Sequence, residues 1–419
     1  MLSLGIDVGT SGVRSAVVEG TTLVSEARAS HPPQDPNHID ARKWWDAVED
    51  CLAAQIAALI EKGRSPKEIA GIAVDGTSGT MVLTDKAIRP VGPALMYNSK
   101  GFDAEAQLIA SLAAGPHITK GSNSALARAM RLCSMAEAEP HHLLHQADFI
   151  AAKLCGHAAG SDHNNALKTG YDPETNSWPD WADQVIAPSL LPSIVAPGTP
   201  IGVIAPEVAD RLGLSLKTQI HAGTTDSIAA FLAASPIELG NAVTSLGSTL
   251  AVKLLSDNRI DDPDIGLYSH RLGAYWLVGG ASNTGGAVLR TFFDDAALVS
   301  LSNQIDPSVA SDLDYYPLLS PGERFPINDP ALPPRLAPRP SDDAAFLHGL
   351  LESIARIEAS CYQKVQARGA NKPKQVLTAG GGAKNSVWRA IRSRHLGVEP
   401  TVAQFDDAAY GAALLVAPR

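Results

Sequence analysis

A turn rich in glycine and hydroxyl residues lies close to the start of the chain, directly after an aspartate. Gly9-Thr10-Ser11-Gly12 stands between two runs of β-prone residues, and Asp7 comes near the end of the first run. A turn of this composition lets backbone N–H groups approach an anion closely. A carboxylate beside the turn can hold a divalent cation against that anion. We interpret this stretch as a strand–turn–strand unit that binds the phosphates of a nucleotide–metal complex.

Two later stretches follow related plans. Residues 242–255 repeat the order of β-prone run, Gly/Ser/Thr turn and β-prone run, and a triple-glycine turn begins at Gly380 after another apolar run. One such turn is more often only a turn, but three of them at strand ends, ordered along one chain, indicate a common role. Two hairpins facing one another would clamp a phosphate chain from both sides.

Asp226 is the candidate for a catalytic base. It follows residues 219–225, which we interpret as a strand leading to a turn, and it precedes a stretch of small and apolar residues that predicts a helix. The structural interpretation is a helix cap or a first-turn acid. The functional interpretation is a base that takes a proton from a hydroxyl, since a helix N-terminus keeps a carboxylate ionised near neutral pH. Asp75 has the same ambiguity, with a turn-forming aspartate as the structural alternative.

Several other kinds of site are absent from the sequence. No GxxxxGK[ST] P-loop, no GxGxxG after a strand and no protein-kinase motif set occurs. The four cysteines and the histidines have no metal-ligand spacing. The nucleotide interpretation therefore depends on the glycine turns.

Composition limits the class of protein. The chain has 419 residues, 45% of them hydrophobic and 19% charged, and this length predicts two folded domains. The net charge of −10 argues against general binding to nucleic acid or to an anionic membrane. No apolar run approaches the roughly 20 residues that span a bilayer. Because Met1 runs almost directly into the first strand and the cysteines lie far apart, we expect a cytoplasmic protein with free thiols and no leader peptide.

The remaining elements must position these turns. Apolar periodicity predicts helices over residues 41–61, 125–138, 145–154, 227–234, 345–368 and 406–416. Short apolar runs predict strands over residues 69–74, 81–83, 219–225, 275–280 and 376–379. We expect residues 103–160 to be mostly helical, residues 161–168 to be a polar patch ahead of a loop region, and residues 306–342 to be a Pro-rich connection.

These features together resemble the FGGY carbohydrate kinases of the sugar kinase/actin/Hsp70 superfamily. The resemblance covers essentially the whole chain and is carried by residues 5–12, 222–226, 245–249, 379–385 and 407–413. It implies an α/β, ribonuclease H-like fold of two domains with a central cleft. A sugar-binding domain is expected at residues 1–233 and a nucleotide-binding domain at residues 234–405, with the C-terminal helix at residues 406–419 packed on the first domain. It also implies Mg²⁺ as cofactor and ATP as co-substrate.

A narrower similarity is to the short xylulokinase-like enzymes of cyanobacteria and plants, which are regarded as D-ribulose kinases. It is carried by residues 75–80, 97–98, 163–168, 279–283, 314–317 and 322–326. The chain lacks the Trp-x-Asp-x-Arg segment of longer FGGY kinases and has Met-Tyr-Asn-Ser-Lys at residues 96–100 instead. The similarity implies that D-ribulose is phosphorylated, at its terminal O5.

Other functions stay open as alternatives. The substrate could be xylulose, L-ribulose or another polyol. From a different class, the chain could be a non-catalytic nucleotide-dependent binding protein, and a phosphohydrolase is a weaker possibility. We expect a pentulose and ATP as partners, neither nucleic acid nor membrane, and a monomer or homodimer.

The resemblance implies roles for residues of the first domain. Asp7 would position Mg²⁺ and the sugar. Thr10 and Ser11 would meet the γ-phosphate, and Thr10 and Asp7 would thereby take part in catalysis. Ser78 would contact the sugar. Asp226 would be the base for the attacking hydroxyl and would also contact the sugar.

In the second domain, the resemblance implies that two turns hold the nucleotide. The β- and γ-phosphates would lie against Gly247, Ser248 and Thr249. The adenosine would lie against Gly381, Gly382, Asn385 and Trp388. For Trp388 a competing interpretation is a core residue, because large aromatic side chains are usually buried.

Overall fold

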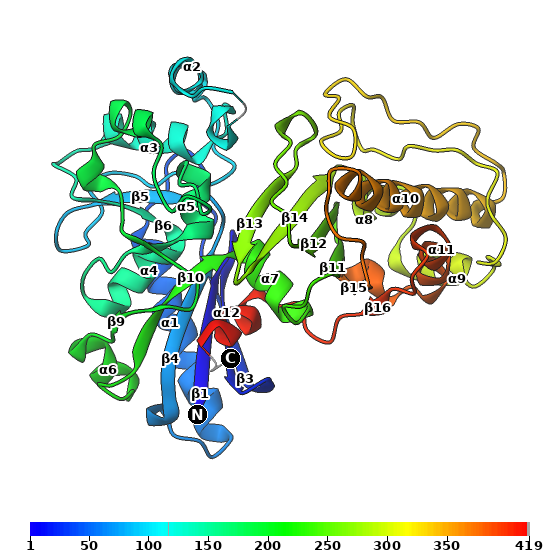
Figure 1. Cartoon of the computed structure of the whole chain (residues 1–419). Helices are drawn as coiled ribbons and strands as arrows, with labels where there is room; N and C mark the ends of the chain where they lie inside the picture. The colour runs from blue at the N-terminus through cyan, green and yellow to red at the C-terminus, as the bar shows by residue number, and fades with distance from the viewer. Residues whose placement is uncertain (116, 417–419) are drawn as a thin grey trace. The chain divides into compact units, whose positions relative to one another are not determined.

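The chain forms two compact units. The computed structural model describes residues 1–115 and 117–416 (Figure 1). Unit 1 consists of Met1–Ala233 and Asp407–Arg419, and unit 2 consists of Ala234–Asp406. No helix in the described ranges is long and apolar enough to cross a membrane. The four cysteines are free thiols, as expected.

Unit 1 is built on a mixed six-stranded sheet with the strand order β3-β2-β1-β4-β10-β9. Its strands are β1 (Leu2–Val8), β2 (Gly12–Glu19), β3 (Thr22–Ser30), β4 (Ile69–Gly76), β9 (Pro200–Val203) and β10 (Gln219–Thr225). The three central strands β1, β4 and β10 are parallel, whereas β2, β3 and β9 are antiparallel to their neighbours. The carboxyl ends of β1, β4 and β10 therefore lie together at one end of the sheet, which we call the carboxyl end.

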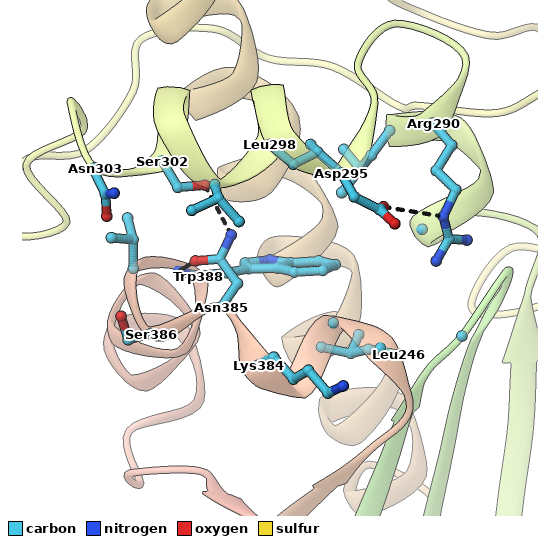
Figure 2. A pocket seen from close by; sticks show the side chains of 17 residues that line it. Leu246, Arg290, Asp295, Leu298, Ser302, Asn303, Lys384, Asn385, Ser386 and Trp388 are labelled. Carbon is cyan, nitrogen blue, oxygen red and sulfur yellow. Dashed lines mark hydrogen bonds and ion pairs between the residues drawn. The ribbon is translucent and has the colours of Figure 1, made fainter.

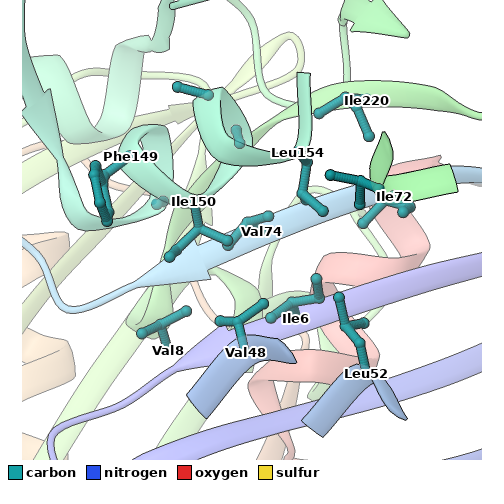
Figure 3. Packing of buried hydrophobic residues seen from close by; sticks show 14 of the residues in the cluster. Ile6, Val8, Val48, Leu52, Ile72, Val74, Phe149, Ile150, Leu154 and Ile220 are labelled. Atoms are coloured by element: carbon teal, nitrogen blue, oxygen red, sulfur yellow. The ribbon is translucent and has the colours of Figure 1, made fainter. Parts of the chain in front are cut away.

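One face of this sheet carries the main apolar core of unit 1. Side chains alternate along a strand, so Leu4, Ile6 and Val8 of β1 share one face. There they belong to one buried cluster with side chains of α1 (Arg42–Glu61) and α4 (Gln146–Cys155) (Figure 3). This packing fixes the direction of β1 and hence the position of the residues at its end.

The opposite face is covered by α12 (Ala408–Val416), the last helix of the chain. At Gly5, a Cβ atom would lie 1.9 Å from the carbonyl oxygen of Ala409, so this close approach requires glycine. Because Asp7 is two residues beyond Gly5, its side chain projects on the face that α12 covers. The fold thus brings the start of α12 close to the end of β1.

The other elements of unit 1 complete the layers around the sheet. They are the helices α2 (Asp103–Leu112), α3 (Ala125–Met135), α5 (His163–Thr169), α6 (Pro206–Leu212) and α7 (Asp226–Ala234). Two short sheets pair β5 (Met81–Thr84) with β6 (His142–His145) and β7 (Ser161–Asp162) with β8 (Ile194–Val195). The strand β6 lies inside residues 103–160, which we expected to be mostly helical.

Residues 161–168, which we expected to be a polar patch ahead of a loop region, form β7 and the buried helix α5. We did not predict these two elements, and mainly irregular chain follows them. Asp162 caps the helix, because its Oδ1 accepts the backbone N–H groups of Asn164 and Asn165 at 2.8 and 3.1 Å. Local hydrogen bonds of this kind allow a polar sequence to be buried in a helix without apolar periodicity.

Unit 2 contains a second mixed six-stranded sheet, with the order β13-β14-β12-β11-β15-β16. Its strands are β11 (Asn241–Leu246), β12 (Leu250–Ser256), β13 (Tyr268–Leu272), β14 (Tyr275–Ser282), β15 (Gln375–Ala379) and β16 (Thr401–Val402). β11 is antiparallel to β12 and parallel to β15, just as β1 is antiparallel to β2 and parallel to β4. The strand–turn–strand plan expected at residues 4–18 and 242–255 is confirmed.

Four helices accompany the unit 2 sheet. They are α8 (Gly286–Arg290), α9 (Asp295–Ser302), α10 (Asp343–Gln366) and α11 (Ser386–Leu396). The apolar side of α10 packs with Leu246 of β11 and Trp388 of α11 in one buried cluster. The guanidinium of Arg392 on α11 donates to Glu358 of α10 at 2.6 Å, and both side chains are buried. These contacts fix α11 against α10 and so hold the turn that precedes α11.

Candidate active site

Four acidic residues gather at the carboxyl end of the unit 1 sheet. Asp7 of β1 lies directly beside Asp75 of β4 in the strand register, and Asp75 lies beside Thr224 of β10. Asp226 follows two residues later as the first residue of α7. Asp407, just before α12, is close enough to affect the pKa of Asp7 and of Asp75. The sequence-predicted residues Asp7 and Asp226 are therefore brought together.

Burial makes the Asp7 carboxyl a weaker acid than usual. The pKa of Asp7 is raised to about 6, and removal from solvent is the largest cause. A hydrogen bond with Asp75 and the charge of Arg14 lower this pKa, and the negative charges of Asp226 and Asp407 raise it. A cation at this place would favour the ionised form of Asp7.

Asp75 is buried more deeply than Asp7. It has no exposed surface, and neither carboxylate oxygen meets an N–H or hydroxyl donor from the described part of the chain. Burial, and then the charges of Asp7 and Asp226, hold the pKa of Asp75 well above its usual range. The neighbouring Asp7 carboxyl is within hydrogen-bonding reach. The structure thus places Asp75 in the acidic group.

Arg14 faces this acidic group, and we did not single it out from the sequence. Its Nη1 lies 3.7 Å from Asp7 Oδ2 and 3.6 Å from Asp407 Oδ2. The register of the first hairpin pairs Arg14 with Asp7 across β1 and β2. Three residues separate the end of β1 from the start of β2, so pairing the two predicted strands across this short turn is the signal that could have identified Arg14.

The acidic group is compatible with a magnesium ion that is held by protein carboxylates together with the phosphates of a bound substrate. No cluster of three or more His, Cys, Asp or Glu side chains placed to hold a metal is found among the described residues. Mg²⁺ is commonly held by one or two carboxylates, with substrate phosphates and water as its other ligands. The buried carboxylate of Asp75, which meets no N–H or hydroxyl donor among the described residues, and its neighbour Asp7 supply such a pair.

The turn between β1 and β2 presents its hydroxyl residues to solvent. Thr10 and Ser11 are exposed, and the turn is closed by a hydrogen bond from Gly9 N to Gly12 O at 2.9 Å. Thr10 and Ser11 therefore lie three and four residues beyond Asp7, on an open turn. A ligand that reaches the acidic group from this side would pass their hydroxyl groups.

The turn after β4 contains Ser78, whose hydroxyl oxygen is buried without a partner among the described residues. Gln146, the first residue of α4, holds this turn, because its Oε1 accepts Thr77 N at 2.9 Å and Thr77 Oγ1 at 2.7 Å. Thr77 and Thr80 hydroxyls lie 2.6 Å apart and close the turn. Ser78 is thus fixed beside the carboxyl end with its own hydroxyl unused.

Several other polar atoms at the same end of the sheet are also buried and unpartnered within the described residues. They are Gln146 Nε2, Asn164 Oδ1 and Thr225 Oγ1. Asn164 reaches the site from α5, where its Nδ2 donates to Thr224 Oγ1 at 3.2 Å. Buried polar groups are normally hydrogen-bonded, and leaving one unpaired costs about 1–3 kcal/mol. A ligand with several hydroxyl groups would satisfy them.

Unit 2 contains a pocket of about 420 Å³ beside the two glycine turns (Figure 2). Of the seven nucleotide-binding residues predicted in unit 2, five line it: Gly247, Gly381, Gly382, Asn385 and Trp388. Ser248 and Thr249 do not line the pocket and are exposed on the adjoining β11–β12 turn. The pocket is formed by unit 2 residues only, from β11, α8, α9 and the start of α11.

Trp388 and Asn385 form the wall of this pocket and are both held by protein contacts. Trp388 is 2% exposed, and its indole N–H donates to Leu351 O at 3.1 Å. Asn385 caps α11, because its Oδ1 accepts Trp388 N at 2.9 Å, and its Nδ2 donates to Ser302 Oγ at 2.9 Å. Trp388 is therefore a core residue as well as a lining residue, so the two interpretations of its sequence are compatible.

The glycine turn at residues 380–382 packs closely against β11 and α11, and side chains at Gly380 and Gly382 would clash there. Gly380 has φ +83°, a backbone conformation that favours glycine. A Cβ atom at Gly382 would lie 2.8 Å from atoms of both Leu246 and Trp388. Glycine at these two positions therefore lets the turn pack against Leu246 and Trp388, and Gly381 and Gly382 line the pocket.

Arg290 is a second cationic residue that the sequence interpretation missed. It lines the pocket, and its guanidinium lies 3.7 Å from the position a Cβ atom would take at Gly286 or at Gly381. Its only ion pair among the described residues is with Asp295, at 3.8 Å, and both side chains are more than half exposed. Arg290 ends a five-residue helix after a glycine pair, and no motif that we used marks that position.

The comparison with known families decides the family. The model of the N-terminal domain of the FGGY family of carbohydrate kinases matches residues 2–233, and the model of the C-terminal domain matches residues 242–417. The chain belongs to the FGGY family of carbohydrate kinases. The resemblance drawn from the sequence is thus confirmed at the level of the family, and the chain is a sugar kinase by family.

Named relatives of this FGGY kinase include xylulose kinases. That of Escherichia coli is 24% identical, with 93% of this chain and 83% of the relative covered. That of Streptomyces coelicolor is 26% identical, with 93% of this chain and 81% of the relative covered. The chain thus spans about four fifths of the length of these two relatives.

Solved structures confirm the two-domain α/β sugar kinase fold. The xylulose kinase of Rhodospirillum rubrum has a TM-score of 0.86 at 21% identity, covering 100% of this chain and 89% of that structure. The glycerol kinase of Plasmodium falciparum with ADP has a TM-score of 0.82 at 14% identity, covering 99% and 88%. At these identities the likeness concerns the fold alone.

Proposed function

We propose that this FGGY kinase transfers the γ-phosphoryl group of MgATP to a pentulose, with D-ribulose as the expected substrate. The short xylulokinase-like sequence pattern supports D-ribulose. The xylulose kinases among the relatives support D-xylulose as the alternative. We further propose that residues 1–233 form the sugar-binding domain and residues 234–405 the nucleotide-binding domain.

The observation that carries this proposal is the carboxyl end of the unit 1 sheet. It combines the acidic residues Asp7, Asp75 and Asp226 with the buried, unpartnered polar atoms of Ser78 and Asn164. A substrate with several hydroxyl groups can satisfy such atoms, and one of its hydroxyl groups needs a base. An apolar ligand would leave them unpaired.

Asp226 is our proposed catalytic base. It begins α7, and its Oδ1 accepts the backbone N–H of Ser227 at 2.6 Å, which fixes the carboxylate at the start of the helix. The sugar hydroxyl oxygen would attack the γ-phosphorus, its proton would pass to Asp226, and the bond to the bridging oxygen would break to release ADP. Ser78 would orient the sugar by a hydrogen bond.

Asp7 is our proposed residue for both magnesium and the sugar, with Asp75 beside it. Mg²⁺, when bound, supplies positive charge that neutralises the transferring phosphoryl group. Thr10 and Ser11 would donate hydrogen bonds to the γ-phosphate from the turn after β1. These residues act by orientation and by electrostatic stabilisation, which is the main work of phosphoryl transfer.

The unit 2 pocket is our proposed nucleotide site. Gly381, Gly382, Asn385 and Trp388 would hold the adenosine, and Gly247, Ser248 and Thr249 would bind the β- and γ-phosphates. The volume of about 420 Å³ suits a ligand of this size. Gly381 and Gly382 line this pocket, so the backbone of their turn is available to the nucleotide.

A pentulose panel tests the proposed function. ADP formation is measured with MgATP and D-ribulose, D-xylulose, L-ribulose or no sugar. We expect sugar-dependent ADP formation with the highest kcat/KM for D-ribulose. A clear preference for D-xylulose would select the alternative substrate. ADP formation that no sugar stimulates would support a phosphohydrolase, and nucleotide binding without any turnover would support a non-catalytic binding protein.

A further inference from the structure

Arg128 is a buried cation beside the proposed sugar site that the catalytic account does not use. It lies in the first turns of α3 with 2% of its surface exposed. Burial lowers the pKa of Arg128 to about 10, and no carboxylate of the described residues pairs with it. A buried charge without a countercharge is costly and therefore uncommon, unless its N–H groups donate hydrogen bonds to nearby acceptors. The Arg128 guanidinium makes such hydrogen bonds.

The guanidinium of Arg128 joins three separate segments of unit 1. Its Nη1 donates to Gly79 O at 2.8 Å. Its Nη2 donates to Tyr97 O at 2.6 Å and to Asn123 O at 2.7 Å. Its Nε donates to Ser99 Oγ at 3.0 Å. Three of these four acceptors are backbone carbonyls, so Arg128 determines backbone positions.

One of the segments is the turn that presents Ser78. The carbonyl that accepts from Arg128 Nη1 belongs to Gly79, the next residue, and Gly79 has φ +83°. The same turn is joined to the second segment again by Tyr97 N, which donates to Thr80 Oγ1 at 3.0 Å. Two independent hydrogen-bonded links therefore hold the Ser78 turn against residues 97–99.

We propose that Arg128 is a positioning residue for the sugar, acting through the turn at residues 77–80. This inference rests on the proposed function, in which Ser78 binds the sugar. A guanidinium carries five N–H donors in a planar fork, which can hold several acceptors in fixed directions at once. An ammonium group is a compact charge on a flexible chain and cannot bind the same set of acceptors in that geometry. The identity of the residue as arginine therefore sets the geometry of the sugar site.

The test compares Arg128→Met and Arg128→Lys with a matched control, Arg131→Met. Arg131 lies on the same helix, its guanidinium is 5.3 Å from the same Phe102 ring that Arg128 approaches at 5.9 Å, and it pairs with Glu105 at 2.6 Å. Steady-state kinetics give KM for D-ribulose, D-xylulose and ATP separately. Calorimetry gives the affinity for each pentulose and for ADP, and thermal unfolding checks the fold.

We expect Arg128→Met to raise the pentulose KM by about tenfold to a hundredfold, since small displacements at a site have effects of this size. Arg128→Lys should give a smaller increase in the same direction. The KM for ATP, the affinity for ADP and all constants of Arg131→Met should stay within about twofold of wild type, because the unit 2 pocket contains no part of these segments.

Three outcomes would contradict the inference. They are an unchanged pentulose KM in folded Arg128→Met, equal losses for pentulose and ATP, or equal effects of Arg128→Met and Arg131→Met. If Arg128→Met does not fold, Arg128→Lys decides, and a wild-type pentulose KM in that variant overturns the inference. A wild-type protein that neither binds nor phosphorylates a pentulose would instead overturn the proposed function, and this inference with it.

Discussion

At the scale of single residues, the chemistry is concentrated where strands end. Asp7 and Asp75 are neighbours in the sheet, and Asp226 follows the next parallel strand. Bringing like charges together without solvent destabilises their ionised forms, as the raised pKa values of Asp7 and Asp75 show. Such a cluster suits a site that binds a cation together with its ligand. We therefore expect that neutralising one of these carboxylates raises the stability of the fold and lowers the activity.

The variant Asp7→Asn tests this expectation, because its effect on stability should depend on pH. A carboxyl whose folded pKa is about 6, above an ordinary value of 3.8, stabilises the fold fully below about pH 3.8 and loses that contribution as pH rises through about 6. Removing its charge should therefore raise stability at pH 7.5 by about 1–2 kcal/mol. The gain should shrink towards pH 4.5, while Mg²⁺-dependent activity is lost. Urea unfolding at both pH values measures this, and equal differences at both would contradict the pKa assignment.

Arg290→Gln tests whether the cation at the unit 2 pocket binds phosphate. Its guanidinium lines the pocket near Gly286 and Gly381 and has only a weak, exposed ion pair. We expect ADP affinity to fall by about tenfold, a loss of about 1.4 kcal/mol, with adenosine affinity unchanged. Arg389→Gln is the control, because Arg389 is on α11 but does not line this pocket. Equal losses for ADP and adenosine would mean that Arg290 supports the pocket wall instead.

At the scale of elements, glycines decide how closely strands, helices and turns approach. α12 can lie on the unit 1 sheet because Gly5 has no side chain, and the pocket turn of unit 2 can lie against Leu246 and Trp388 because Gly382 has none. Each of these contacts places a functional segment: the start of α12 near Asp7, and the backbone of the 380–382 turn on the pocket surface. The prediction for Gly5 belongs at this scale.

Gly5→Ala should destabilise unit 1. The new Cβ would lie 1.9 Å from Ala409 O, which forces α12 away from β1. Overpacking of this kind costs about 1–3 kcal/mol, and more where backbone must move. We expect a lower thermal unfolding temperature and lower activity. Gly121→Ala is the matched control, since a Cβ there meets nothing within 4 Å and its φ is negative. Equal stability of the two variants would contradict the packing argument.

The sequence predicted most elements, because their apolar patterns are periodic. The helices α1 and α10 and the first hairpin agree with expectation. Helix α5 was missed because its stability comes from buried polar contacts, such as Asp162 capping, which leave no apolar pattern. Arg14 and Arg290 were missed because their importance depends on register and on packing across segments that are distant in the sequence.

At the scale of the whole molecule, the chain uses one plan twice. Each unit centres on a strand that is antiparallel to the next strand and parallel to a later one. The two copies have diverged in what they present, since unit 1 presents acids and hydroxyl groups and unit 2 presents a glycine-lined pocket. The chain also returns to unit 1 at its end, so unit 1 is complete only when the last segment is present.

A chain that stops at residue 405 tests the importance of that return. It lacks α12, whose residues between Ala408 and Ala413 are buried and whose Tyr410 hydroxyl donates to Thr21 O at 2.6 Å. Uncovering this face of the sheet should cost several kcal/mol, at about 25 cal/mol per Å² of apolar surface. We expect loss of soluble, pentulose-binding protein. Tyr410→Phe is the control, expected to lose only about 1 kcal/mol. A truncated chain with wild-type unfolding temperature would contradict this role of α12.

The most direct test of the central claim is sugar-dependent ADP formation by wild type and Asp226→Asn, with the phosphorylated pentulose identified as product. Wild type should form ADP and pentulose phosphate in equal amounts. Asp226→Asn should bind ADP and unfold at nearly the wild-type temperature, with kcat at least about 10²-fold lower, the lower bound for losing a general base. Near-normal turnover by Asp226→Asn, or wild-type ADP formation without a phosphorylated sugar, would contradict the account.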